Sequence, residues 1–187
     1  MKRVFALVLF TLCLSILSAQ AQFKATPSGI STITGDSFYV VDIKDKSAQE
    51  LYSAVETYIM TTFRNPNAVE NSTNSKLINI HAVFSKAFLG VKYFGNQYAD
   101  VDMNLIIHFK DGRIRFDIPK INSMPMEKGP GGWEEVVFSD ATLTATAMFN
   151  KRGQAKNTEV VESFNKFING VVSDIVQAAK SNAYENW

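Results

Sequence analysis

The longest regular pattern in the chain is an alternation of apolar and polar residues between positions 98 and 118. Apolar residues occupy every second position from Ala99 to Phe109, which predicts an extended strand with one buried face. Asp111-Gly112 then predicts a two-residue type I′ turn, after which the alternation resumes on a returning strand. The face of this hairpin that is expected to point away from the core carries Asp100, Asp102, Asn104, Ile106, His108, Arg115 and Asp117.

Two other segments carry apolar residues at helical spacing. Ser47, followed three residues later by Glu50, is a capping box and predicts a helix that begins there. A longer apolar stripe predicts a C-terminal helix over about residues 157–180, with Asn157 or Thr158 as its cap. The two stripes consist of Leu51, Val55, Tyr58, Ile59 and Phe63, and of Val160, Val161, Phe164, Phe167, Ile168, Val171, Ile175 and Val176.

Shorter patterns of β-branched, aromatic and alternating residues predict strands over residues 37–44, 77–84 and 143–149. The elements therefore follow the order strand, helix, several antiparallel strands, helix. Two helices packed on one face of a curved antiparallel sheet would bury the single apolar face that these strands share. We expect an α+β fold of this kind.

The start of the chain is predicted to be a secretory signal. Lys2 and Arg3 precede an apolar run of about 14 residues, which is shorter than the ~20 residues needed to cross a bilayer. Ala19 and Ala21 are small residues at the positions that a signal peptidase reads. We expect residues 1–21 to be removed, and the exported chain, without a transmembrane segment, to be periplasmic or secreted.

The rest of the chain is expected to form one domain. Residues 22–35 are small and polar and are predicted to be a flexible leader. The domain would cover residues 36–187 and include a Pro/Gly loop at 123–135. Within that loop, Trp133 is either an aromatic platform for a ligand or a plug folded onto the core, and we prefer the plug.

Composition excludes several classes of function. Without the signal, 17 of the 19 basic residues remain against 18 acidic ones, a net charge of −1, whereas a nucleic-acid-binding protein would have a basic excess. Cys13 is the single cysteine and leaves with the signal. The mature chain therefore has no disulfide, no thiol nucleophile and no cysteine metal ligand.

The polar face of the hairpin resembles a metal site at first sight. Asp100, Asp102 and Asn104 have the spacing found at the start of a calcium-binding loop, but such a loop needs glycine at its sixth position and this chain has Leu105 there. The extended strand also separates alternate side chains by about 7 Å. We expect no metal site and no cofactor.

Catalysis on this face is not favoured either. His108 is expected to lie opposite Arg115, a cation that lowers its basicity, with Asp117 as a diagonal neighbour. His81 could pair with an acid of the strand over 98–109, but the sequence leaves that register open. The chain contains no nucleophile elbow, phosphate-binding glycine loop or His-Glu-x-x-His motif. We assign no catalytic residue, and the residues expected to contact a ligand or partner are Asp100, Asp102, His108, Arg115 and Trp133.

Several of these segments together resemble a known family. FYVVDIKDKSAQELYSAVETYI, LIIHFKDGRIRFDI and the C-terminal helix followed by Asn-Trp are similar to secreted Bacteroidetes domains of unknown function with a TATA-binding-protein-like (TBP-like) fold. KDGRIRFDI, residues 110–118, is the most specific part, and the similarity covers roughly residues 37–122. The resemblance implies helices packed on a sheet, and it implies no activity, because the family has none assigned.

Two functions from different classes are consistent with these features. The first is a non-enzymatic binding module of the bacterial periplasm or envelope, which would meet a protein, peptide or glycan through the polar sheet face or the Trp133 loop. The second is a hydrolase of an envelope polymer that uses acidic and histidine residues of the sheet face. The hydrolase requires a concave pocket that gathers at least two of Asp100, Asp102, His81 and His108.

Overall fold

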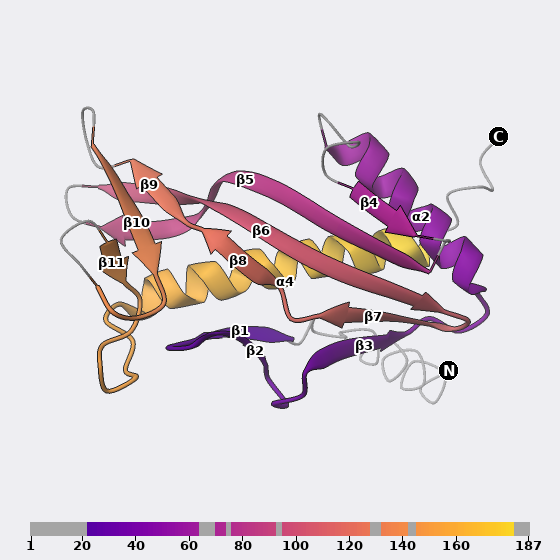
Figure 1. The fold of residues 1–187 in the computed structure, drawn as a ribbon, viewed down its shortest axis with the longest axis horizontal. Coiled ribbons are helices and arrows are strands. Elements are labelled where there is room, and N and C mark those ends of the chain that lie inside the picture. The colour runs from indigo at the N-terminus through magenta and orange to yellow at the C-terminus, as the bar shows by residue number, and fades with distance from the viewer. Residues whose placement is uncertain are drawn as a thin grey trace, which may run out of the picture.

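The computed structural model of the protein describes residues 22–63, 70–73, 76–92, 95–127, 132–141 and 145–181. These residues form a two-stranded sheet, a nine-stranded sheet and two helices (Figure 1). The elements are β1 (Phe23–Thr26), β2 (Gly29–Thr32), β3 (Phe38–Asp42), α2 (Ala48–Thr62), β4 (Glu70–Thr73), β5 (Leu77–Lys92), β6 (Asn96–Lys110), β7 (Arg113–Asp117), β8 (Lys120–Ser123), β9 (Pro125–Glu127), β10 (Trp133–Val137), β11 (Ala145–Ala147) and α4 (Thr158–Lys180).

The large sheet is built around two long strands, β5 and β6. Its order is β11-β10-β9-β6-β5-β4, with β7 and β8 also pairing with β6 and β3 pairing with β7. The pairs are antiparallel except β10 with β11. In Figure 1, α4 runs behind the sheet along much of its length, and α2 lies near the end where β6 turns into β7. The prediction of an α+β fold with two helices on an antiparallel sheet is confirmed.

The predicted hairpin has the expected register. His108 pairs with Arg115 and Lys110 with Arg113 across the two-residue loop. The prediction of a type I′ turn is wrong, because that turn needs a positive φ at both central residues and here only Gly112, at 73°, has one. Asp111 instead serves the neighbouring helix, since its Oδ1 accepts a hydrogen bond of 2.8 Å from the N–H of Ala48 at the start of α2.

The apolar face of the sheet and the helices form one continuous core. The predicted stripe of β6, from Ala99 to Ile107, is completely buried at its apolar positions. Leu51, Val55 and Ile59 of α2 are completely buried as well. From α4 the core receives Val160, Phe164, Ile168, Val172, Ile175 and Ala179.

The prediction of a flexible leader is wrong for residues 23–32, which form the β1–β2 hairpin. Phe23 is 0 % exposed and belongs to the core. Asn169 of α4 holds it there, because its Oδ1 accepts a 2.9 Å hydrogen bond from the N–H of Phe23 and its Nδ2 donates one of 2.8 Å to the carbonyl of Phe23. A segment of mostly small and polar residues therefore forms a hairpin that packs on α4 through one large buried side chain, Phe23.

The predicted Pro/Gly loop at 123–135 is also largely wrong. Ser123 ends β8, and β9 and β10 form an antiparallel pair in which Trp133 lies opposite Glu127. Residues 128–131, between these two strands, lie outside the described residues. The loop signal from Pro125 failed because Pro125 lies at the first position of a short strand, where the sheet tolerates proline.

The capping box of α2 makes the free energy of unfolding depend on pH in the acidic range. Hydrogen bonds from the Ser47 hydroxyl and then the Ser47 backbone N–H lower the pKa of Glu50 below its ordinary value of 4.5. The ionised carboxylate therefore contributes stability above about pH 4.5, and that contribution is lost as pH falls through the lower pKa of the folded state.

We expect Glu50→Gln to have a lower melting temperature than the wild type at pH 6, and the two melting temperatures to converge near pH 3. Circular dichroism melts at half-unit pH steps would measure the difference. A gap that stays constant with pH would contradict an ionised Glu50 as its source. Glu162→Gln, at an exposed position of α4, is the control.

No helix among the described residues combines the length and the hydrophobicity needed to cross a membrane. The predicted signal at residues 1–21 lies outside the described residues.

Candidate functional site: the open sheet face and the groove beside β5

The open sheet face, defined here as the face of β5, β6 and β7 opposite the helices, contains two histidine–aspartate pairs. His81 Nε2 lies 2.9 Å from Asp102 Oδ1, and His108 Nε2 lies 3.1 Å from Asp117 Oδ2. The first pair settles the strand register that the sequence left open. Asn122 also donates to Asp102 Oδ1, at 2.9 Å. His81, Asp102 and Asn122 thus form one hydrogen-bonded cluster, and His108 and Asp117 form a second one.

Arg115 joins the second pair and the apolar part of the same face. Its Nε lies 3.1 Å from Asp117 Oδ1, so Asp117 bridges His108 and Arg115. Its guanidinium also lies over the ring of Phe38, 5.2 Å from the centroid. Phe38, Val40 and Val83 are exposed here, whereas Ile106, expected to be exposed, is half-buried. The open sheet face is therefore a mixture of ion pairs and apolar side chains.

Asp100 has a structural partner. Its Oδ1 accepts a 2.7 Å hydrogen bond from the N–H of Lys86. Lys86 has a positive φ of 50° and lies in the irregularity of β5 between Phe84 and Phe88. The carboxylate of Asp100 thus holds a β-bulge, which accounts for its position without a ligand.

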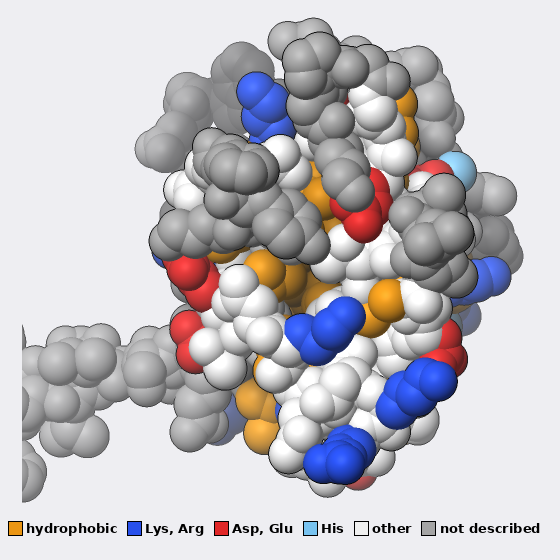
Figure 2. Space-filling view, turned by 90° about the vertical axis from the view of Figure 1, so that its left-hand side faces the viewer, with side chains coloured by type: hydrophobic (Ala, Val, Ile, Leu, Met, Phe, Trp, Pro, Cys, Tyr) orange, Lys and Arg blue, Asp and Glu red, His pale blue; other side chains and the backbone are white. Residues whose placement is uncertain are grey.

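Trp133 is exposed at the far end of the sheet, which contradicts the preferred interpretation of it as a plug. Its side chain is 68 % exposed, while its neighbours Glu134 and Val136 are buried. Figure 2 shows the end of the molecule where β9, β10 and β11 lie, and its coloured basic, acidic and apolar side chains are interspersed. Trp133 remains a candidate for partner contact on a surface of mixed character.

The chemistry available on the open sheet face is limited. Among the described residues no group of three or more His, Cys, Asp and Glu side chains is placed to hold a metal ion. A groove formed by the described residues beside β5 is lined by His81 but by none of Asp100, Asp102 and His108. It therefore does not meet the geometric requirement stated above for the hydrolase.

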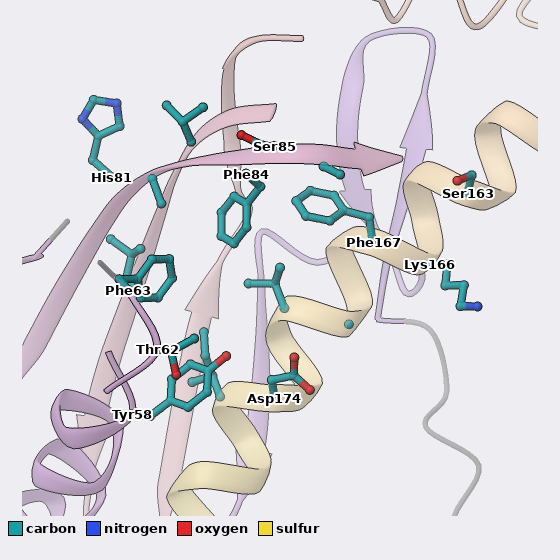
Figure 3. Close-up of a pocket in the computed structure, with 17 residues that line it drawn as sticks. Tyr58, Thr62, Phe63, His81, Phe84, Ser85, Ser163, Lys166, Phe167 and Asp174 are labelled. Carbon is teal, nitrogen blue, oxygen red and sulfur yellow. The ribbon is translucent and has the colours of Figure 1, made fainter. Parts of the chain in front are cut away.

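This groove lies between β5, the C-terminal end of α2 and the middle of α4 (Figure 3). Its volume is about 1050 Å³. Three aromatic rings meet in it, from β5, from α4 and from the residue that follows α2: the ring centroid of Phe84 is 5.9 Å from that of Phe63 and 5.3 Å from that of Phe167. Both pairs pack edge to face, so the floor of the groove is apolar.

Polar groups lie around this floor. Lys166 and Asp174 are exposed residues of α4 that line the groove and are eight positions apart, which is about 12 Å along a helix. Burial, and then the negative charge of Asp174, raise the pKa of Tyr58, while a hydrogen bond with Thr62 acts in the opposite direction. The Tyr58 hydroxyl is thus kept protonated near the Asp174 end.

Sequence reasoning missed this groove and assigned its residues to helix and strand faces. One signal was present: Gly170 interrupts the apolar stripe of α4, and glycine inside a helix is destabilising by about 0.5–1 kcal/mol relative to alanine. The structure places Gly170 in the groove wall, and a Cβ atom added to it would meet nothing within 4 Å. Close packing therefore does not explain this glycine.

Comparisons with known proteins identify the fold. No family model and no curated protein matches the chain. The solved structures that match include a TBP-like protein from Parabacteroides distasonis, with a TM-score of 0.56 and 14 % identity over 77 % of this chain and 91 % of that one. A DUF4468 family protein from Bacteroides ovatus matches with a TM-score of 0.48 and 12 % identity over 80 % and 87 %. The similarity to the first structure establishes that this chain has a TBP-like α+β fold.

Proposed function

We propose that this protein is an exported, non-enzymatic binding module that holds a segment of a partner polypeptide of the cell envelope in the groove beside β5. The observation that carries the proposal is the groove itself. Its apolar floor and its charged rim resemble the pattern of protein recognition sites, in which a buried apolar centre is surrounded by polar groups. The N-terminal signal pattern supports export.

A polypeptide fits the groove better than a glycan does. The aromatic rings of Phe63, Phe84 and Phe167 pack edge to face against one another rather than presenting one open platform on which a sugar ring would stack. The groove also follows the backbone of β5, from Ile80 to Ala87. An elongated apolar groove beside a strand suits an extended chain with side chains that enter the floor.

Peptide binding can be tested with residues 22–187 and a panel of fluorescein-labelled heptapeptides. Each peptide alternates threonine with Leu, Val, Phe, Glu or Lys and carries one photoreactive residue. We expect at least one peptide to raise the fluorescence polarisation saturably, and its cross-links to map to Tyr58, Thr62 or Phe167. Cross-links confined to Trp133 or to the open sheet face would overturn the groove as the site. The absence of binding by every peptide would overturn the proposed function.

A further inference from the structure

We infer that the partner segment binds as an added β-strand, antiparallel to β5, and that its groove-facing residues follow the order acidic, apolar, basic at every second position. This inference rests on the proposed function and specifies the conformation, direction and chemical pattern of the partner. Three independent features of the described residues carry it: the outer edge of β5, the space at Gly170 and the separation of Lys166 from Asp174.

The outer edge of β5 has backbone groups available for a further strand. β4 pairs with β5 from Leu77 to Ile80, and no described strand pairs with the outer side of β5 beyond that point. The edge continues to the bulge at Lys86, and beyond the bulge the N–H of Leu89 donates to Ser163 Oγ at 2.9 Å. Among the described residues, the part of this edge without a strand partner therefore spans residues 81–85. Exposed edges of this kind accept extended peptides through main-chain hydrogen bonds.

The register identifies which backbone groups point outward. The N–H of Phe109 donates to the carbonyl of Lys76. In an antiparallel ladder this bond makes Leu77–His108 a pair without mutual hydrogen bonds, and it makes the next pair, Ile78–Ile107, a hydrogen-bonded one. Alternation then directs the N–H and C=O groups of Val83 and Ser85 away from β6, toward the open edge. The Val83 side chain lies on the open sheet face and is 64 % exposed.

An added strand would divide its side chains between two faces. Residues opposite Val83 and Ser85 would form the main-chain hydrogen bonds and point their side chains to the open sheet face. Residues opposite Ala82 and Phe84 would point toward α4, where the groove lies, and so would the residue two positions before them in the added strand, which would lie beside the bulge at Lys86. The second set decides specificity because it meets the aromatic floor and the charged rim.

Gly170 supplies the space that an apolar side chain of the partner needs. It lies midway between Lys166 and Asp174 on α4, and the space above its Cα is empty of described atoms within 4 Å of an added Cβ. Phe167 and Val171 flank it in the groove wall. An apolar residue in the middle of the partner segment would fill this position.

The two charges fix the spacing and the direction. About 12 Å along α4 corresponds to four residues of a strand at ~3.3 Å each, so the two groove-facing residues that meet them are separated by four positions. Because four is an even number, both of these residues of the added strand point to the same face, which is the one that meets α4. α4 runs antiparallel to β5, because Leu89 contacts Ser163 while Phe84 contacts Phe167. A strand antiparallel to β5 would therefore place its acidic residue, opposite Lys166, before its basic residue, opposite Asp174.

The test compares labelled heptapeptides by fluorescence polarisation. The first has the sequence Thr-Glu-Thr-Leu-Thr-Lys-Thr, and the second exchanges Glu and Lys. We expect the first to bind about threefold to tenfold more tightly, the effect of two exposed charge pairs. The double variant K166E/D174K should reverse this preference. Equal affinities for both orders, or an unchanged preference in the double variant, would overturn the assigned direction and charge pattern.

Backbone methylation tests strand addition separately. N-methyl groups on the two threonines that flank leucine would remove hydrogen bonds to β5, and we expect an affinity loss of at least about tenfold. The control peptide carries its N-methyl group on leucine, whose N–H points away from β5, and should lose less than about threefold. Equal losses would overturn strand addition. In either test, retained binding of the parent peptide with cross-links to Phe167 would leave the proposed function intact.

Discussion

Replacing Phe23 with alanine is expected to lower the free energy of unfolding by about 3–5 kcal/mol, the range for removing a buried phenylalanine. Phe23 is 0 % exposed, and its ring meets that of Tyr39 edge to face at 6.2 Å. The loss would leave a cavity between the β1–β2 hairpin and the core. At 2–4 °C per kcal/mol for a domain of this size, the melting temperature should fall by roughly 6–20 °C.

The control for this experiment is Ile33→Ala. Ile33 lies just after the same hairpin but is 49 % exposed, so its replacement should change the free energy of unfolding by less than about 0.5 kcal/mol. Urea unfolding followed by circular dichroism would compare both variants with the wild type. Equal midpoints for Phe23→Ala and Ile33→Ala would mean that the hairpin does not dock, and that the flexible leader inferred from composition was right after all.

Gly170→Leu is expected to separate stability from binding. The substitution removes a helix-interior glycine and meets no described atom at its Cβ, so the free energy of unfolding should rise by about 0.5–1 kcal/mol. The new side chain would occupy the groove, and the affinity for Thr-Glu-Thr-Leu-Thr-Lys-Thr should fall by at least about tenfold. Thermal melts and fluorescence polarisation measure the two effects on the same sample.

Glu162→Leu provides a matched control for the groove. It places leucine on the same helix at an exposed position that does not line the groove. We expect this variant to bind the peptide as the wild type does. If Gly170→Leu destabilised the protein, the space at Gly170 would not be open as described. If it left binding unchanged, the groove would not be where this peptide binds.

Local patterns predicted both helices, the strands β3, β6 and β7, and parts of β5 and β11, because those elements carry their signals in neighbouring residues. The strands β4, β8, β9 and β10 were not predicted. The capping box at Ser47, the cap at Asn157 and the alternation from Ala99 to Phe109 all appear in the structure. The β1–β2 hairpin was missed because it is stabilised by Asn165 and Asn169, residues about 140 positions away, and not by a pattern of its own.

The candidate sites show the same difference between features set by neighbouring residues and features set by distant ones. The pairing of His108 with Arg115 followed from the hairpin turn, whereas the pairing of His81 with Asp102 depended on a strand register that no turn determines. The groove is formed by residues of α2, β5 and α4 together, so the pattern of no single segment predicts it. Trp133 was misassigned because its surroundings read as a loop, while the structure places it in a strand with its ring exposed.

The contact between the β1–β2 hairpin and α4 has a consequence for how the chain must fold. The first and last elements that the structure describes complete the same core, and their hydrogen bonds join residues separated by up to 146 positions. Contacts between such distant residues form late, because a large loop must close first. During synthesis the hairpin would have no partner until α4 had left the ribosome. A nascent chain that lacked α4 would therefore leave the backbone of the hairpin without its asparagine partners and Phe23 without part of its packing.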